Sequence, residues 1–275
     1  MTVLRRGKTV LTSTADAVTE QLLADAMLGA TPTASRMPND ASARVARGTP
    51  TLTLLNVAAQ DEYGVTRIAD ATFSVNSGEI VGIAAIEGAG QRELLRVLAG
   101  RLVQTSGTVR LPEAVGFVPE DRHRDAIILD ATLTENLALR GAANRRGVMP
   151  WKTLDGITNA LLRTRDVRAV DERVMMRSLS GGNQQKFVVG RELADSPAAL
   201  VVENPTRGLD IRATADVHTA LRAARDAGTA VVVYSSDLDE VLLLSDRVLV
   251  VAAGVVRDAG SDRDAIGLAM LDASR

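Results

Sequence analysis

A glycine-rich turn at residues 85–93 has the composition of a loop that holds phosphate groups. It follows the continuous apolar run 80–85 and precedes an amphipathic segment at 91–102, where a buried strand would end and a helix begin. Backbone N–H groups in such a turn, together with the N-terminus of the helix, attract phosphate. The residues of the turn that we expect to contact a nucleotide are Glu87, Gly88, Ala89, Gly90, Gln91, Arg92 and Glu93.

This turn departs from the usual phosphate-binding pattern at the two positions that carry its chemistry. That pattern requires a lysine, which reaches the β- and γ-phosphates, followed by a serine or threonine, which binds Mg²⁺. Here the two positions are Gln91 and Arg92. Taken alone, the turn is explained equally well as a structural glycine turn between a strand and a helix.

A second, more specific pattern lies further along the chain. Residues 179–186 have the sequence LSGGNQQK, and residues 200–210 have the sequence LVVENPTRGLD. Residues 118–122 (VPEDR) precede both strings, and Ser235-Ser236-Asp237 follows the apolar run 230–234. In their order and spacing these segments resemble the signature, the Walker B strand with its D-loop, the Q-loop and the switch region of ATP-binding-cassette (ABC) ATPases.

The resemblance extends to one branch of that family and covers residues 51–260. The strings GAGQREL (88–94), 118–124 and SGGNQQK resemble the second cassette of tandem ATPase subunits from bacterial sugar and nucleoside importers. In those subunits one polypeptide carries two cassettes, and the second is often degenerate. The resemblance implies an α/β fold, with a P-loop ATPase core of largely parallel sheet, an antiparallel edge sheet and an inserted helical subdomain.

The substitutions at the catalytic positions predict little or no ATP hydrolysis by this chain alone. By the resemblance, Glu203 retains a carboxylate at the Walker B aspartate position, Asn204 replaces the catalytic glutamate, and Ser236 replaces the switch histidine. An amide cannot accept a proton as a general base. Slow turnover supported by Arg92 and Glu203 remains the alternative, and nucleotide binding without turnover is compatible with the surviving glycines.

The signature is intact, and the resemblance gives it a role at a second nucleotide. In the family two cassettes dimerise head to tail, and each signature covers the nucleotide held by the partner's loop. The signature residues that we expect at the partner's nucleotide are Ser180, Gly181, Gly182 and Gln184. We therefore expect ATP as cofactor, with Mg²⁺ at the composite site, and we assign no metal site to this chain itself.

Three further residues take roles from the resemblance. Glu120 belongs to the Q-loop, Asp210 to the D-loop, and Tyr63 to the position of an aromatic residue that stacks on adenine. For Tyr63, a half-buried tyrosine at a strand edge is the alternative. The charged cluster 120–125 is interpreted as a solvated Q-loop rather than a metal site. Asp237, Asp239 and Glu240 are expected to form an exposed acidic first turn of a helix.

The elements that must position these residues follow from the apolar pattern. Strands are expected at 51–58, 68–75, 80–85, 200–202 and 230–234, and helices at 91–102, 183–193 and 211–227. Strand–turn–helix units in this order predict an α/β domain with a largely parallel sheet. The stretch of about 122–177 lacks such strands and is expected to be the helical subdomain, within an ATPase domain at 51–275.

The first fifty residues have a different character. Residues 31–50 are rich in Pro, Ser, Thr and Ala and predict a flexible linker. Residues 1–30 offer one short strand (2–4), a turn and a helix at 17–28, and their strand–Gly–strand pattern also occurs at 250–256. If this is an internal repeat rather than chance, residues 1–30 are the tail of a preceding cassette.

Composition excludes several classes of function. Lysine and arginine total 32 against 34 acidic residues, so the chain lacks the basic excess of a nucleic-acid-binding protein. There is no cysteine, there are two histidines, and the longest strongly apolar run, 248–256, is shorter than the ~20 residues of a spanning helix. We expect a soluble, intracellular chain.

The expected setting follows from the resemblance. It implies a cytoplasmic subunit, peripheral on the inner face of the membrane, whose partners are an intact ABC cassette in the same or a separate chain, membrane permease subunits and, indirectly, a solute-binding protein. The alternatives are a regulatory or structural remnant without enzymatic activity and a cassette protein acting on nucleic acid or ribosomes. The balanced charge argues against the last of these.

Overall fold

The fold was analysed in a computed structural model of the 275-residue chain. The structure describes residues 2–5, 8–14, 48–142 and 145–271. Most of the expected linker and the helix expected at 17–28 lie outside the described residues. Among the described residues, no helix is long and apolar enough to cross a membrane.

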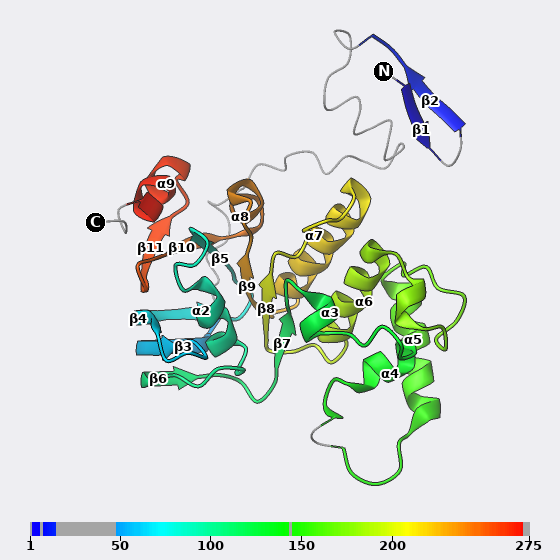
Figure 1. The fold of residues 1–275 in the computed structure, drawn as a ribbon, viewed down its shortest axis with the longest axis horizontal. Coiled ribbons are helices and arrows are strands. Elements are labelled where there is room, and N and C mark those ends of the chain that lie inside the picture. The colour runs from blue at the N-terminus through cyan, green and yellow to red at the C-terminus, as the bar shows by residue number, and fades with distance from the viewer. Residues whose placement is uncertain (1, 6–7, 15–47, 143–144, 272–275) are drawn as a thin grey trace.

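A nine-stranded mixed sheet, in the order β6-β3-β4-β11-β10-β5-β9-β8-β7, organises the chain (Figure 1). Neighbours β10, β5, β9, β8 and β7 run parallel, whereas β3 pairs antiparallel with β4 and β6. The predicted parallel core with an antiparallel edge is therefore confirmed. The strands are β3 (Pro50–Gln60), β4 (Thr66–Asn76), β5 (Ile80–Ala85), β6 (Ser106–Arg110), β7 (Val115–Val118), β8 (Ala199–Glu203), β9 (Ala230–Tyr234), β10 (Arg247–Ala252) and β11 (Val255–Gly260).

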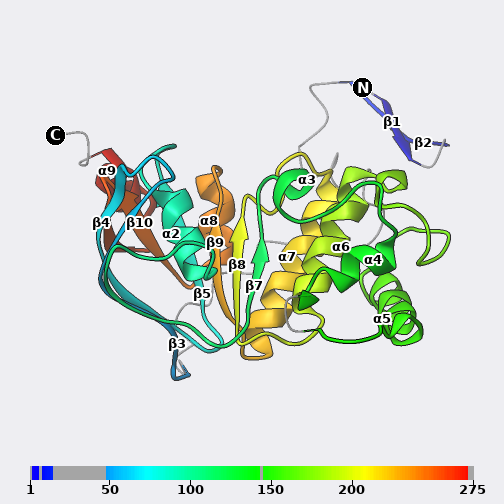
Figure 2. The same cartoon turned by 60° about the horizontal axis from the view of Figure 1, so that its bottom comes forward.

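Helices cover both faces of the sheet (Figure 2). Helix α2 packs on β3, β4 and β8, while α7 packs on β9 and α8 on β5. The helices are α2 (Gln91–Leu98), α3 (Arg122–Asp125), α4 (Leu133–Ala138), α5 (Trp151–Thr164), the 3-10 turn η3 (Met176–Ser178), α6 (Gly181–Leu193), α7 (Ile211–Asp226), α8 (Leu238–Leu244) and α9 (Arg263–Leu271). Helix α2 ends four residues before the predicted limit because Gly100 adopts a left-handed conformation, a common stop signal.

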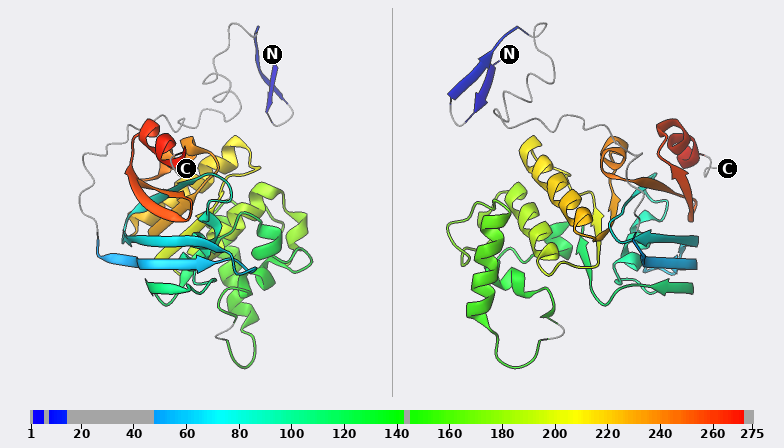
Figure 3. Two further views of the ribbon diagram at one scale, coloured as in Figure 1. Left: turned by 60° about the vertical axis from the view of Figure 1, so that its left-hand side comes forward. Right: turned by 180° about the vertical axis from the view of Figure 1, so that it is seen from behind.

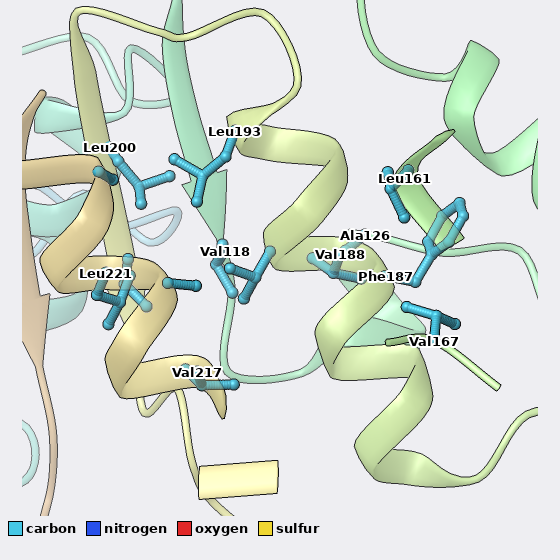
Figure 4. Packing of buried hydrophobic residues seen from close by; sticks show 14 of the residues in the cluster. Val118, Ala126, Leu161, Val167, Phe187, Val188, Leu193, Leu200, Val217 and Leu221 are labelled. Atoms are coloured by element: carbon cyan, nitrogen blue, oxygen red, sulfur yellow. The ribbon is translucent and has the colours of Figure 1, made fainter. Parts of the chain in front are cut away.

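The central strands are buried on both faces, which explains their unbroken apolar sequences. Successive residues of β9 enter different cores: Val231 and Val233 join the core formed with α6 and α7, while Val232 and Tyr234 join the core formed with α2. Residues of the first core that meet between the sheet, α6 and α7 include Val118, Leu200, Val188, Val217 and Leu221 (Figure 4).

The stretch 122–177 is helical, as predicted, and contains α3, α4, α5 and η3. Its described residues contribute a single isolated bridge, between Thr132 and Met175, and no named strand. Helices α4 and α5 pack together at the end of the molecule opposite to β3, β4 and β6 (Figure 3).

Two hairpins carry the sequence pattern that suggested an internal repeat. Strands β1 (Thr2–Arg5) and β2 (Lys8–Thr12) form a separate two-stranded antiparallel sheet. Strands β10 and β11 form the other hairpin, but β10 also pairs with β5 and β11 with β4. Both copies of the pattern are therefore hairpins, and only the second is built into the large sheet among the described residues.

Candidate nucleotide-binding site

A cavity of about 220 Å³ opens where the central strands end. The carboxyl ends of β5, β7, β8 and β9 meet there, at the edge where α/β sheets usually bind ligands. Its lining residues are Glu87, Gln91, Arg92, Leu95, Arg96, Glu120, Asp121, Arg124, Asp125, Glu203 and Tyr234. The predicted turn, the Q-loop and the Walker B position thus come together from separate parts of the sequence.

The turn after β5 depends on two glycines in left-handed conformations. Gly90 is the N-cap of α2 and has a φ of 106°, and a Cβ there would lie 2.3 Å from the carbonyl oxygen of Arg67. Only glycine fits this position. Gly88, with a φ of 85°, also adopts a left-handed conformation. The first N–H groups of α2 have no acceptor within the helix and are oriented to attract an anion.

Gln91 occupies the lysine position but is held inside the protein. It is 3% exposed, and its Nε2 donates to the hydroxyl of Tyr234 at 3.4 Å. Tyr234 in turn donates to Glu87 Oε2 at 3.3 Å. Burial and the neighbouring carboxylate of Glu87 raise the pKa of the Tyr234 phenol. Tyr234 lines the cavity although no sequence motif singled it out.

Two arginines of α2 bring positive charge to the cavity. Arg92 is exposed and makes no hydrogen bond or ion pair with the described residues, whereas Arg96 Nη2 pairs with Asp125 Oδ2 at 3.2 Å. The Nε atom of Arg96 is buried and has no partner among the described residues. Arg96 belongs to none of the motifs, although its position four residues after Arg92 places both on one helix face.

The residues at the catalytic positions bind each other. Asn204 Nδ2 donates to Glu120 Oε2 at 2.9 Å, and Asn204 Oδ1 accepts the backbone N–H of Ser236 at 2.7 Å. Arg207 forms an ion pair with Glu120. Asn204 therefore ties the Q-loop to the switch region through both its amide nitrogen and its amide oxygen.

Glu203 is a buried acid beside this network. Its Oε2 accepts the backbone N–H of Glu120 at 3.3 Å, and its Oε1 has no partner among the described residues. Burial raises the pKa of Glu203 to about 7, against the opposing pull of Arg96 and Arg92. Near neutral pH this carboxyl is therefore partly protonated.

The residues of this cavity do not fit Mg²⁺. Mg²⁺ requires hard oxygen ligands in near-octahedral geometry, and the hydroxyl position of the loop is occupied by the cation Arg92. No cluster of three or more His, Cys, Asp or Glu side chains able to hold a metal occurs in the described parts of the chain. The neighbouring Asp121 caps α3 by accepting the N–H groups of His123 and Arg124.

The signature lies at the N-terminus of α6. Ser180 is the exposed N-cap of this helix of 13 residues, and its Oγ accepts from Asn183 Nδ2 at 3.0 Å. Gly181 and Gly182 form the first turn. Gln184 is buried instead: its amide donates to Met176 and Leu179 carbonyls and accepts from His123 Nε2 at 2.9 Å. Gln184 thus joins the signature to this chain's own Q-loop.

Other predicted residues take distinct positions. Asp210 caps α7 by accepting the N–H of Ala213 at 2.8 Å. Tyr63 is 82% exposed in the turn between β3 and β4, so it is not the half-buried strand residue of the alternative interpretation. The prediction of an exposed acidic turn was wrong for Glu240, which is 8% exposed and accepts hydrogen bonds from His218 at 2.6 Å and Thr206 at 2.8 Å.

Several curated proteins are similar in sequence to nearly the whole chain. The nucleoside import ATP-binding protein NupA of Lactococcus lactis is 34% identical over 98% of this chain and 57% of its own length. The guanosine import ATP-binding protein NupO of Bacillus subtilis is 34% identical over 92% of this chain and 52% of its own length. The ribose import ATP-binding protein RbsA of Bacillus licheniformis is 31% identical over 96% of this chain and 55% of its own length. The chain spans about half the length of these curated relatives.

Solved structures share the fold. A dimeric post-hydrolysis state of the ATP-binding cassette MJ0796, bound to ADP and phosphate, superposes with a TM-score of 0.66 at 21% identity, covering 77% of this chain and 99% of that one. An ATP-binding subunit of an ABC transporter gives a TM-score of 0.67 at 18% identity, covering 82% and 100%. The family model described as ABC transporter matches residues 68–207. The chain therefore belongs to the ABC transporter family.

Proposed function

We propose that this chain is the signature-donating half of a composite ATPase that drives the import of a nucleoside or simple sugar. Its own nucleotide site does not hydrolyse ATP, and its signature completes the site of an intact partner cassette. The observation that carries the proposal is the contrast between the two regions: Ser180 and the glycines beside it stand exposed at a helix N-terminus, whereas Asn204 is locked between Glu120 and Ser236.

The absence of a general base supports the first half of the proposal. A base must reach the proton of the attacking water. The Asn204 amide has no basic lone pair for this and is bound on both sides, and Ser236 offers no cation to the γ-phosphate. Losing a single electrostatic donor lowers the rate by about 10²–10³-fold in comparable sites. Removing the base and the switch cation together leaves this site with negligible turnover.

The geometry of the signature supports the second half. The N-terminus of α6 has free N–H groups and a positive dipole end, which favours a γ-phosphate presented from outside the chain. The nucleotide contacts of this surface are Ser180, Gly181 and Gly182, with Asp210 in the adjoining D-loop. Gln184 holds the signature against Arg122 and His123 instead. Mg²⁺ belongs to the partner's site in this arrangement.

The names of the relatives support the import role. NupA, NupO and RbsA are import ATP-binding proteins for nucleosides, guanosine and ribose. By the same reasoning the chain works at the inner face of the membrane with permease subunits, and indirectly with a solute-binding protein. Within the chain, residues 51–275 form the ATPase domain with a helical subdomain at about 122–177. Residues 31–50 serve as a linker, and 1–30 as the tail of a preceding cassette.

The test is steady-state ATP turnover by an intact ABC cassette, with and without this chain. The wild-type chain is expected to raise turnover by at least about tenfold, and Gly181→Asp is expected to abolish this effect by placing a carboxylate against the partner's phosphates. A Cβ at Gly181 meets only the flexible end of Arg122, so the backbone there accommodates a side chain.

Gly156→Asp is the matched control, because Gly156 is exposed on α5 with open space around its Cβ position. It should stimulate turnover like the wild-type chain. Equal turnover with and without every version of the chain would reject the proposal and favour a regulatory remnant without a role in hydrolysis.

A further inference from the structure

The nucleotide cavity contains a cation where related loops place a metal ligand. Arg92 stands on the first turn of α2 and has no hydrogen bond or ion pair with the described residues. Guanidinium has five donors in a planar fork that matches phosphate oxygens. An unpaired guanidinium beside a helix N-terminus is therefore a ready site for a second contact to the same phosphate chain.

Buried polar groups around the cavity lack partners. Arg96 Nε, Gln91 Oε1 and Glu203 Oε1 are all buried without a hydrogen bond among the described residues. Gln91 is 3% and Glu203 6% exposed. Most buried polar atoms in folded proteins are paired, so a cluster of unpaired ones in the lining of one cavity indicates a polar ligand there.

Most carboxylates of the same cavity are already engaged. Asp125 pairs with Arg96, Glu120 with Asn204 and Arg207, and Glu87 accepts from Tyr234. Asp121 caps α3, and Glu203, whose Oε1 has no partner among the described residues, is buried, so completing the oxygen shell of a divalent cation would require several of these contacts to break. Arg92 carries a positive charge that no ion pair with the described residues neutralises, and both arginines lie close enough to act on the charge of Glu203.

We infer that the loop of residues 85–93 binds the phosphates of ATP without a divalent cation, with Arg92 and Arg96 supplying the positive charge. The inference rests on the proposed function only in treating this loop as a nucleotide site. It adds that the two sites of the assembly differ in metal requirement: the partner's site uses Mg²⁺, and this chain's own site does not.

The test is equilibrium dialysis of the full chain against radiolabelled ATP, in Mg²⁺ and in EDTA. The wild-type dissociation constant should change less than about threefold between the two media. Arg92→Ser, which restores the hydroxyl of the usual pattern, should weaken binding in EDTA by at least about tenfold, whereas Arg92→Lys keeps the charge and most of the binding. Arg110→Ser, at an exposed arginine of β6 outside the cavity, is the control and should behave as wild type.

Three results would overturn the inference: a loss of about tenfold or more in EDTA for the wild type, no ATP binding in either medium, or an Arg92→Ser variant that binds like the wild type in EDTA. Turnover of the intact partner cassette, measured with the same preparations, separates this inference from the proposed function. Stimulation by a chain that binds no ATP overturns only the inference, whereas Mg²⁺-free binding without stimulation overturns only the signature role.

Discussion

At the scale of single residues, Asn204 shows how a substitution at a catalytic position becomes part of the structure. Its amide provides both a donor, to Glu120, and an acceptor, for the N–H of Ser236. A glutamate offers acceptors alone. The residue that removes the general base is therefore also the residue that joins the Q-loop to the switch region.

Restoring the acid at this position should not restore catalysis. Asn204→Glu places a carboxylate against Glu120, where 2.9 Å now separates Asn204 Nδ2 from Glu120 Oε2. We expect no gain in ATP turnover and a loss of about 1–3 kcal/mol in the free energy of unfolding, measured by urea denaturation. Adding Glu120→Gln should recover most of that stability, because the neutral amide can donate to the new carboxylate. A stable single variant that hydrolyses ATP would contradict this account of Asn204.

The buried acid Glu203 predicts a pH dependence of stability. Its pKa is raised by burial from 4.5 to about 7, so the folded chain retains a proton that the unfolded chain releases above pH 4.5. The contribution of this group to the free energy of unfolding is therefore full below pH 4.5 and is lost as the pH rises to about 7. The shift corresponds to about 3 kcal/mol.

Urea denaturation between pH 5 and pH 8 measures this contribution. Glu203→Gln should flatten the decline with rising pH, since the amide does not titrate. Glu113→Gln, at an exposed position, should leave the decline unchanged. If the free energies of unfolding of the wild type and Glu203→Gln fall in parallel with rising pH, burial does not raise the pKa of Glu203.

At the scale of elements, the sequence predicted most closely the bounds of strands that are long apolar runs, whereas the short apolar strand β7 was not predicted. Strands β5 and β9 have the bounds expected from their runs, and β8 differs by one residue at each end. Strand β6 (Ser106–Arg110) was missed because it is short, mostly polar and exposed at the sheet edge. The motifs predicted the loop, the signature and the Walker B position. Tyr234 enters the cavity through tertiary packing, which no local pattern records, whereas the four-residue spacing from Arg92 could have indicated Arg96.

Helix α8 provides the clearest case of a pattern that tertiary structure overrides. Its acidic first turn is typical of a solvated helix start, and Asp239 is indeed exposed. Glu240, the next residue, faces inward and joins α8 to His218 of α7 and to Thr206 beside the D-loop. Burial alone would raise the pKa of Glu240, but the hydrogen bonds from His218 and its neighbours outweigh burial and lower it.

The buried hydrogen bonds of Glu240 should contribute far more to the free energy of unfolding than the exposed ion pair of Asp239 on the same turn. Glu240→Ala leaves His218 and Thr206 without their buried acceptor, and we expect it to lower the free energy of unfolding by about 3 kcal/mol. Asp239→Ala removes an exposed ion pair with Arg263 and should have almost no effect. Thermal and urea denaturation of both variants measure the two losses in the free energy of unfolding. Equal losses would mean that Glu240 acts merely as another surface charge of the helix.

At the scale of the whole molecule, the two hairpins differ in what supports them. The β10–β11 hairpin is part of the large sheet, because β10 pairs with β5 and β11 with β4. Within the described residues, β1 and β2 pair only with each other. A two-stranded hairpin alone is marginally stable in water, so β1 and β2 lack the support that the second hairpin has.

Hydrogen exchange should show that difference directly. In the isolated chain, amides of β1 and β2 are expected to exchange within the shortest labelling times, whereas those of β5 and β9 exchange only through global unfolding. If residues 1–30 are the tail of a preceding cassette, fusing that cassette ahead of them supplies the missing sheet neighbours and slows exchange in β1 and β2. Fusing an unrelated domain of similar size is the control and should leave exchange fast. Protection of β1 and β2 equal to that of β5 in the isolated chain would reject the tail assignment, because the hairpin would then already have its partners within this chain.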